Sequence, residues 1–347
     1  MTTPRYATRL NSFASAGHLE WPGAGGKPTM IQMAQRAAKV VGLTDLDLNY
    51  PDHVAEAPAE IARELGNIGL SINGLAMRYY SRPEFRMGAF THPDPLVRRQ
   101  AIDLTKSGID AALEAGCGLM TLWLGQDGFD YAFQADYMTL WQHEVDGIRE
   151  VALHDPACQI SLEYKPNEPR SYSLMPDCAT TLLAIRDVGL ANVGVTLDFA
   201  HALYADEQPA FAAALIARHS KLLGVHLNDG YAKRDDGLMV GAVHPIQTIE
   251  LLRQMRKDGY AGAIYFDTFP DVTGLDPVRE CEANIATVQR MLQVVDRLEQ
   301  DNRLAEAIDR QDPVSTQSIL SQVLLGPEAL AHGALGRPHT EHHHWQD

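Results

Sequence analysis

The chain has 347 residues, a formal charge of −16 and 45% hydrophobic residues. This length and composition allow a large buried core in one or two domains. The acidic balance argues against a nucleic-acid partner, because phosphate binding requires a basic field. No apolar stretch approaches the length of a membrane span, so no membrane partner is expected.

The cysteines and the first residues favour a cytoplasmic location. The four cysteines are widely spaced and form no Cys-x-x-Cys pair, which indicates reduced thiols and not a disulfide framework. The opening segment "MTTPRYATRLNSF" lacks the apolar core of a secretory signal peptide.

Short β-branched or apolar runs alternate along the chain with stretches of helical periodicity. The clearest helical stretches are "TMIQMAQRAAKVVG" (29–42), "VRRQAIDLTKSGIDAALEAG" (97–116) and "IQTIELLRQMRKDG" (246–259). Gly259 stands where the last of these helices is expected to end. The predicted strands, in chain order, are 8–14, 45–50, 70–77, 118–125, 160–166, 193–201, 222–229 and 263–269.

Eight strands alternating with helices predict a (β/α)8 TIM barrel over residues 1–299, because this many βα units favours a closed barrel over a doubly wound sheet. The glycine-rich "PGAGGKP" (22–28) matches no phosphate-binding fingerprint and is interpreted as a loop. Residues 300–347 show helical periodicity without strands and predict a C-terminal helical extension and tail that packs on the barrel or contacts another subunit. The histidine run 342–344 is interpreted as part of that terminus.

Polar side chains end four consecutive predicted strands. In a (β/α)8 barrel the active site lies at the carboxyl ends of the strands. Residues two apart share one face of a strand, so Glu163 and Lys165 are expected to point inward together, as are His226 and Asn228. The strand-end residues are Glu163, Lys165, Asp198, His201, His226, Asn228 and Asp267.

These carboxylates and imidazoles predict a divalent-metal site. Converging acidic side chains repel one another without a cation, and an oxygen-rich set suits Mn, Mg or Co better than Zn. The loop "YAKRDDGL" (231–238) offers Asp235 and Asp236 for a second ion together with His201, with Asp198 bridging. A single Asp or His at a strand end more often caps a helix than binds a metal, whereas four such residues on neighbouring strands favour metal binding.

The stretch "EYKPNEPR" (163–170) resembles the Glu-x-Lys-Pro-Asn-Glu-Pro-Arg stretch of xylose isomerases. "SRPEFRMGAFTHPDPLVRRQAI" (81–102) resembles the segment that follows their third strand. The ligand set, with Asp followed by His in "LDFAH", is similar to that of L-rhamnose isomerases. The resemblance covers roughly residues 10–298. It implies a xylose isomerase-like TIM barrel that acts as a metal-dependent aldose–ketose isomerase on a small sugar, assembled as a homodimer or homotetramer.

The resemblance also implies roles for single residues. Lys165 would bind the substrate carbonyl oxygen and stabilise charge there during a metal-assisted hydride shift between C1 and C2. Asp267 is a candidate for both ligation and catalysis. The family's Asp-x-Asp spacing is shifted by one residue here, so Asp235 and Asp236 stay alternatives. The implied ligands of two ions are Glu163, Asp198, His226 and Asp267 for the first, and His201 and Asp235, with Asp198 shared, for the second.

Some positions depart from the family pattern or are open. Arg82 stands where xylose isomerases have a ring-opening histidine, and a guanidinium cannot shuttle a proton. It is expected either to bind an anionic or hydroxyl-rich end of the substrate or to form a salt bridge. His92 is expected to open the ring or to cap a helix. Trp123 and Phe269 are expected to form an apolar wall for the sugar or to pack in the core, and Asn228 is expected to donate a hydrogen bond to a substrate hydroxyl.

Three alternatives remain beside the isomerase. A sugar 3-epimerase of the same fold uses two glutamates as acid and base. The strand-eight residue here is Asp267, not a glutamate, and Lys165 lies two residues after Glu163; both departures argue against an epimerase. A metal-dependent hydrolase or lyase, such as a nuclease, is disfavoured by the acidic charge, and an inert sugar-binding barrel by a lysine among ligands. Glu168 and Arg170, beyond the strand, are expected to pair with each other or across subunits, or to contact substrate.

Overall fold

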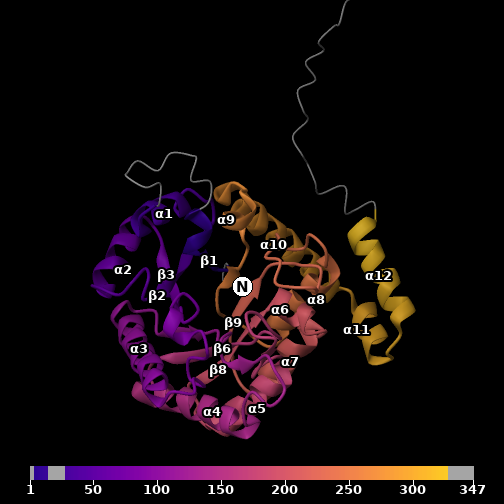
Figure 1. Ribbon diagram of the computed structural model, residues 1–347. Coiled ribbons are helices and arrows are strands. Elements are labelled where there is room, and N and C mark those ends of the chain that lie inside the picture. The colour runs from indigo at the N-terminus through magenta and orange to yellow at the C-terminus, as the bar shows by residue number, and fades with distance from the viewer. Residues whose placement is uncertain (1–3, 15–27, 327–347) are drawn as a thin grey trace, which may run out of the picture. The chain divides into compact units, whose positions relative to one another are not determined.

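The computed structural model describes residues 4–14 and 28–326. Within these residues eight parallel strands close into a barrel in the order β1-β10-β9-β8-β6-β4-β3-β2, seen end-on in Figure 1. The predicted (β/α)8 barrel is therefore confirmed. The glycine-rich stretch 22–27 and the histidine run 342–344 lie outside the described residues. The barrel strands are β1 (Tyr6–Arg9), β2 (Asp45–Tyr50), β3 (Ser71–Met77), β4 (Leu119–Leu122), β6 (Gln159–Glu163), β8 (Val193–Asp198), β9 (Leu222–Leu227) and β10 (Ile264–Phe266).

Helices form a ring outside the barrel (Figure 1). The strands are thus covered on both faces, which explains why every residue of β8 is buried. Gly259, with a φ of +72°, follows the end of α8 as predicted, because it adopts the left-handed conformation that ends many helices. The helices are α1 (Met30–Ala37), α2 (Pro58–Asn67), α3 (Pro95–Glu114), α4 (Tyr137–His154), α5 (Cys178–Val188), α6 (Phe199–Tyr204), α7 (Pro209–His219), α8 (Pro245–Lys257), α9 (Pro270–Thr273) and α10 (Pro277–Gln300), with 3₁₀ turns η1 (Leu10–Ala14) and η2 (Pro83–Phe85).

The first strand differs from its prediction. The strand predicted over 8–14 is wrong beyond Arg9, where β1 ends and η1 begins. Leu10 and Phe13 are both fully buried, and their spacing of three residues places them on one side of a 3₁₀ turn. Arg9 therefore lies at the carboxyl end of the barrel.

Two short strands outside the barrel fasten two loops to each other. β5 (Gly128–Phe129) and β7 (Tyr172–Ser173) pair in antiparallel orientation. They join the loop after β4 to the loop after β6, and Arg170 adds an ion pair to Asp130 at 2.6 Å. The backbone N–H of Lys165 donates to a carbonyl in the same region, that of Met175. The loop that carries Lys165 is thus held at both ends.

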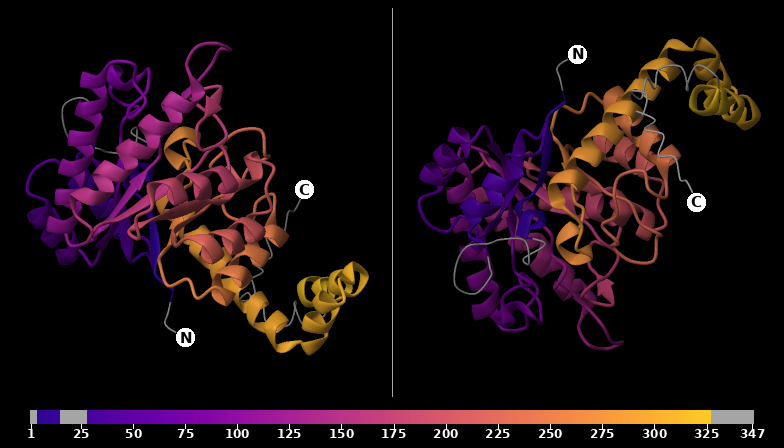
Figure 2. Two further views of the ribbon diagram at one scale, coloured as in Figure 1. Left: turned by 90° about the horizontal axis from the view of Figure 1, so that it is seen from below. Right: turned by 90° about the horizontal axis from the view of Figure 1, so that it is seen from above.

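The chain divides into two compact units, residues 1–288 and 289–347. In the second unit, α11 (Asn302–Asp309) and α12 (Pro313–Leu325) pack on each other, as both views of Figure 2 show in yellow. The predicted helical extension is confirmed, while the domain boundary at residue 299 stays a prediction. Among the described residues, no helix combines the length and the apolar character needed to cross a membrane.

Candidate metal centre

The carboxyl ends of the barrel strands surround a cavity of about 310 Å³. Barrel enzymes place their active sites at this end, and small-molecule sites usually measure ~300–1,000 Å³. Every barrel strand, or the segment that follows it, contributes lining. The polar and charged residues of the lining include Arg9, Asp47, Arg78, Thr121, Glu163, Lys165, His201, His226, Asp235 and Asp267.

Four side chains at the ends of neighbouring strands form a compact cluster. Glu163 and Asp198 are the last residues of β6 and β8. His226 lies in β9, and Asp267 follows β10. Each offers one ligand atom, and these atoms all lie within 4.8 Å of one another. The strand register explains this closeness in part, because Asp198 is the direct neighbour of His226 across β8 and β9.

The charge balance of this cluster depends on its histidines. Burial alone would lower the pKa of His226, but the carboxylates of Glu163 and Asp267 outweigh burial and raise that pKa to about 9. Burial would raise the pKa of Glu163, yet His226 and His201 bring it below its ordinary value. Burial raises the pKa of Asp198 to about 7 in spite of the nearby His201. Without a metal, protons therefore supply the positive charge that the carboxylates require.

The donor set fits a divalent ion of the Mg, Mn or Co type, since three carboxylates and one imidazole are mainly hard oxygen ligands. Nδ1 of His226 is buried without a hydrogen-bond partner, although Oε1 of Glu163 lies only 3.3 Å away. This spacing of an imidazole nitrogen and a carboxylate oxygen fits two ligands of one ion, and ligation by both residues stays a prediction.

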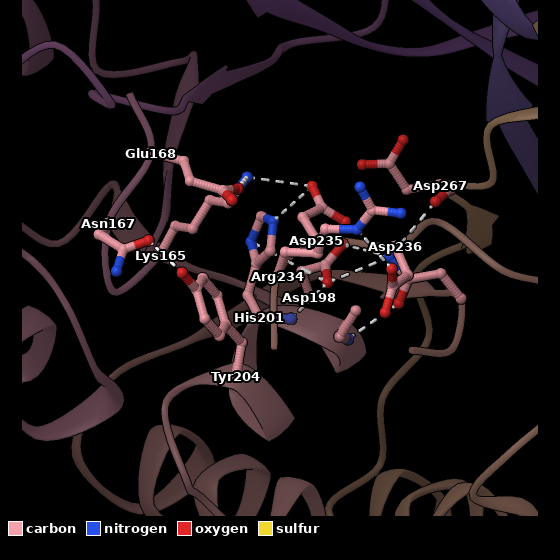
Figure 3. A network of polar contacts seen from close by, with 12 residues as sticks. Lys165, Asn167, Glu168, Asp198, His201, Tyr204, Arg234, Asp235, Asp236 and Asp267 are labelled. Carbon is pink, nitrogen blue, oxygen red and sulfur yellow. Dashed lines mark hydrogen bonds and ion pairs between the residues drawn. The ribbon is translucent and has the colours of Figure 1, made fainter. Parts of the chain in front are cut away.

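A second group of ligand-type side chains adjoins the cluster, as Figure 3 shows. Oδ2 of Asp235 lies 3.1 Å from Nε2 of His201 and 3.2 Å from Nζ of Lys165. The other ring nitrogen of His201 lies 3.0 Å from the carbonyl oxygen of Tyr164, which orients Nε2 toward Asp235. Asp198 caps α6 by accepting the backbone N–H of His201 at 2.9 Å. One carboxylate thus belongs to the cluster and orients the start of the helix that carries the histidine.

Lys165 is held in this cavity as a cation. Burial alone would lower its pKa, but the carboxylates of Asp235 and Glu168 outweigh burial and raise the pKa above its ordinary value. Nζ lies 2.9 Å from Oε2 of Glu168 and 5.3 Å from the centre of the Trp123 ring. An ammonium fixed here can donate to a substrate oxygen that is bound at the cluster.

Of the two adjacent aspartates, Asp235 lines the cavity and Asp236 does not. Asp236 accepts the backbone N–H of Tyr231 at 2.8 Å and Nε of Arg234 at 2.7 Å. In Figure 3 Asp235 lies between Lys165 and Asp236, with its carboxylate toward the lysine. Asp236 therefore shapes the loop after β9, and ligation by Asp235 stays a prediction with a suitable geometry.

The two aromatic residues predicted to face the substrate, Trp123 and Phe269, both line the cavity. The ring of Trp123 meets that of Tyr80 edge to face, with centroids 5.3 Å apart. The guanidinium of Arg9 lies 4.8 Å from the centre of the Phe269 ring. Both rings are therefore fixed by neighbours and present apolar surface to the cavity.

Asn228 lies beneath the cluster and is fully buried. Its Nδ2 donates to Oδ2 of Asp198 at 3.1 Å, and its Oδ1 accepts the backbone N–H of Ala200 at 2.9 Å. The cavity lining does not include it. In the structure Asn228 positions Asp198, and the hydrogen bond to a substrate hydroxyl stays a prediction.

Comparison with known protein families agrees with the barrel. A family model described as "Xylose isomerase-like TIM barrel" matches residues 33–299. The chain belongs to this family. Xylose isomerase from Thermus thermophilus is 26% identical over 246 residues, which cover 68% of this chain and 64% of that protein. The chain thus matches less than two thirds of the length of that relative.

Solved structures of similar fold also come from sugar enzymes. A D-tagatose 3-epimerase-like protein superposes with a TM-score of 0.67 and 16% identity, covering 84% of this chain and 98% of that one. L-ribulose 3-epimerase superposes with a TM-score of 0.67 and 17% identity, covering 86% of this chain and 97% of that one. At such identity the likeness supports the xylose isomerase-like fold alone.

Two residues proposed from the xylose isomerase-like pattern lie outside the cavity. Nδ1 of His92 accepts the backbone N–H of Asp94 at 3.0 Å, next to the start of α3. Arg82 lies 3.3 Å from Glu84 and lines a second cavity. Among the described residues, the histidines that line the first cavity are His201 and His226. Ring opening by His92 and substrate binding by Arg82 stay predictions.

Glu168 and Arg170 have separate partners, so of the three alternatives considered for them the mutual ion pair is excluded. Glu168 pairs with Lys165, and Arg170 pairs with Asp130. Glu168 has a φ of +69°, a left-handed conformation that turns the chain between the two residues. The charged half of "EYKPNEPR" thus stabilises Lys165 on one side and the β5–β7 pair on the other.

Three charged lining residues were missed by reasoning from the sequence: Arg9, Asp47 and Arg78. Burial raises the pKa of Asp47 to about 7, and Asn73 donates to it at 2.8 Å. The signals existed, because "DLDLNY" carries polar residues with a period of two, and Arg78 directly follows the third strand. The prediction from charged strand ends covers only the second half of the barrel.

Proposed function

We propose that this protein is a divalent-metal-dependent aldose–ketose isomerase that acts on a small sugar. The observation that carries the proposal is the position of Lys165. Its ammonium lines the same cavity as Glu163, His226 and Asp267 and is kept charged by two carboxylates. Binding alone would not require a buried cation beside a cluster of ligands, whereas charge development on a carbonyl oxygen would.

Glu163, Asp198, His226 and Asp267 would hold the first ion. His201 and Asp235 would hold the second ion, with Asp198 shared. When bound, such ions polarise the two oxygens of a hydroxy-carbonyl substrate and favour ionisation of the hydroxyl.

The residues of the chain would then act on the substrate as follows. The hydrogen on C2 moves with its electron pair to C1, while the proton of the C2 hydroxyl ends on the oxygen of C1. Lys165 donates a hydrogen bond to that oxygen while its negative charge grows. Glu168 keeps Lys165 paired when Asp235 is engaged elsewhere. Trp123 and Phe269 exclude water from the carbon face, so that the migrating hydrogen does not exchange.

An isotope experiment tests this proposal. The protein is loaded with Mn²⁺, Mg²⁺ or Co²⁺ and incubated with a panel of aldoses and ketoses in D₂O. We expect at least one aldose–ketose pair to interconvert with little solvent deuterium at C1 or C2, read by NMR. If no pair interconverts with any of the three ions, the isomerase proposal is wrong.

A ketose 3-epimerase is the second candidate. It is favoured by the fold that the chain shares with two proteins named as 3-epimerases or like them. Epimerisation removes the proton from C3 and returns one to the other face. The same D₂O experiment would then show deuterium at C3 and no aldose product.

We further propose that the protein works in the cytoplasm as a homodimer or homotetramer. Cys117, Cys158, Cys178 and Cys281 are free thiols, and burial raises the pKa of each. Thiols of this kind are poorly reactive, which suits a reducing compartment without disulfides. Light scattering coupled to gel filtration measures the copy number, and a monomer would contradict the proposed assembly.

A further inference from the structure

The side of the cavity across from His226 carries an arginine without a counter-ion. Arg78 directly follows β3, and β3 stands opposite β9 in the closed strand order. The guanidinium of Arg78 lines the cavity, and its Nε is buried without a hydrogen-bond partner. No carboxylate among residues 4–14 and 28–326 forms an ion pair with it.

The other two Arg and Lys side chains in this lining both have carboxylate partners, although Nε of Arg9, like that of Arg78, lacks a hydrogen bond. Arg9 lies 3.1 Å from Asp271 and 3.9 Å from Asp267. Lys165 has two carboxylate partners, as described above. Arg78 is therefore the one of these three cations whose charge is available to a ligand.

A row of aromatic rings connects Lys165 to this arginine. Nζ of Lys165 lies 5.3 Å from the Trp123 ring, and the Trp123 and Tyr80 rings are 5.3 Å apart. The guanidinium of Arg78 lies 5.2 Å from the centre of the Tyr80 ring. A sugar chain lying along this wall would have one end at Lys165 and the metal cluster and the other at Arg78.

The surface beyond Tyr80 is also basic. Tyr80 lines both the first cavity and a second one of about 380 Å³. The second cavity is lined by Arg82, Arg86 and Arg170 and by one carboxylate, Asp130, which already pairs with Arg170. Arg82 pairs with Glu84 and Arg170 with Asp130, so Arg86 is the arginine of this lining without a carboxylate partner among the described residues.

We propose that the substrate carries an anionic group, a carboxylate or a phosphate, at the end of its carbon chain remote from the metal cluster, and that Arg78 binds this group. A guanidinium pairs with either anion through two parallel hydrogen bonds, which neutral hydroxyls cannot match. The orientation rests on the proposed function, because the metal cluster decides which end reacts. The substrate class is then acidic sugars or sugar phosphates, not neutral sugars.

Binding of unreactive analogues tests this without turnover. The Mg²⁺-loaded protein is titrated by calorimetry with xylitol, xylitol 5-phosphate and xylonate, none of which has a carbonyl group to isomerise. We expect at least one anionic analogue to bind about tenfold or more tightly than xylitol, a difference of ~1.4 kcal/mol. Whichever analogue shows the preference identifies the group as phosphate or carboxylate.

Variants assign the preference to the arginine. Arg78→Met is expected to bind all three analogues within about threefold of one another. Arg63→Met, which removes an exposed arginine from α2, is the control and should keep the preference. Arg78 has no carboxylate partner to orphan, so thermal unfolding should show a folded Arg78→Met protein. If it does not fold, Arg78→Gln takes its place.

Two results would overturn the proposal. One is equal binding of xylitol and both anionic analogues by the native protein. The other is a preference that survives Arg78→Met, because the anion would then bind at the metal cluster. Since no analogue reacts, an Arg78-dependent preference stands even if no aldose–ketose pair interconverts, and isomerisation of neutral sugars stands even if the preference is absent.

Discussion

The two halves of the barrel mouth carry opposite chemistry. The half built from β6, β8, β9 and β10 presents Glu163, Asp198, His226 and Asp267, and its lysine and histidines all lie near carboxylates. The half built from β1 to β4 presents Arg9, Arg78, Trp123 and a single carboxylate, Asp47. The difference underlies both proposals: one half would bind cations, and the other would recognise the substrate on which those cations act.

The largest effect is expected for the Asp198→Asn variant, in the cation-binding half of the barrel mouth. Asp198→Asn keeps the shape of a fully buried side chain but removes the charge shared by both proposed ion sites. We expect metal affinity to fall more than about 100-fold, because losing a ligand should cost more than losing an outer-sphere partner, whose loss costs up to about 100-fold. Turnover should fall with the affinity. Calorimetry with Mn²⁺ measures the affinity. A variant that still binds two ions would contradict the bridging role.

Lys165→Met separates chemistry from metal binding in the same half. It removes the ammonium but none of the proposed ligands, so metal content should stay unchanged. Turnover is expected to fall about 10²–10³-fold, the usual loss for one donor to a developing oxyanion. Metal analysis and steady-state kinetics provide the two readouts. Unchanged turnover would remove Lys165 from the mechanism.

The pH dependence of metal binding follows from the raised pKa of His226. With a pKa of about 9, His226 is protonated near neutrality, and an ion must displace that proton. Affinity should therefore rise with pH, about tenfold per unit below pH 9 for one proton released. Calorimetry in two buffers of different ionisation enthalpy counts the protons. Binding at pH 7 without proton release would contradict this assignment.

The smallest effect is expected for a substitution at Glu144, a buried carboxylate outside the barrel mouth. Glu144 in α4 is fully buried, and neither of its carboxylate oxygens has a hydrogen-bond partner. Burial, with the nearby Asp127, raises its pKa well above 4.5, so this group destabilises the fold increasingly as pH rises above 4.5. Glu144→Leu should increase the free energy of unfolding at pH 8 by about 1–3 kcal/mol, and by less at pH 5.

Urea unfolding at both pH values measures this difference, and turnover provides the control. Because Glu144 does not line the cavity, the variant should keep its activity. A gain in stability that is the same at pH 5 and pH 8 would mean that packing, not ionisation, is responsible.

The fold could be predicted from the sequence because strands covered on both faces read as continuous apolar runs. The exact ends of the strands could not be predicted, because the residues that follow a strand into the site continue its alternation of apolar and polar residues. The last strand was predicted over 263–269 but ends at Phe266, and Asp267 and Phe269 already belong to the segment after it.

The site could be predicted only in part, because some of its residues lie beyond the strand ends, where alternation no longer fixes their side. Alternation placed His226 and Asn228 on one face, but β9 ends at Leu227, so Asn228 turns beneath the cluster. Lys165 also lies beyond its strand, yet it stays in the cavity because tertiary contacts hold it. Such contacts join residues distant in sequence, as with Lys165 and Asp235, and no local pattern contains them.

The pairing of β5 with β7 has a consequence for how the protein fails on heating. The loop of Lys165 is fastened by this short ribbon and by the ion pair of Arg170 with Asp130, not by the barrel ladder. Small units of this kind open at a lower free energy than a closed barrel does. We therefore expect inactivation to precede melting on heating, because opening of this ribbon would release Lys165 before the barrel unfolds.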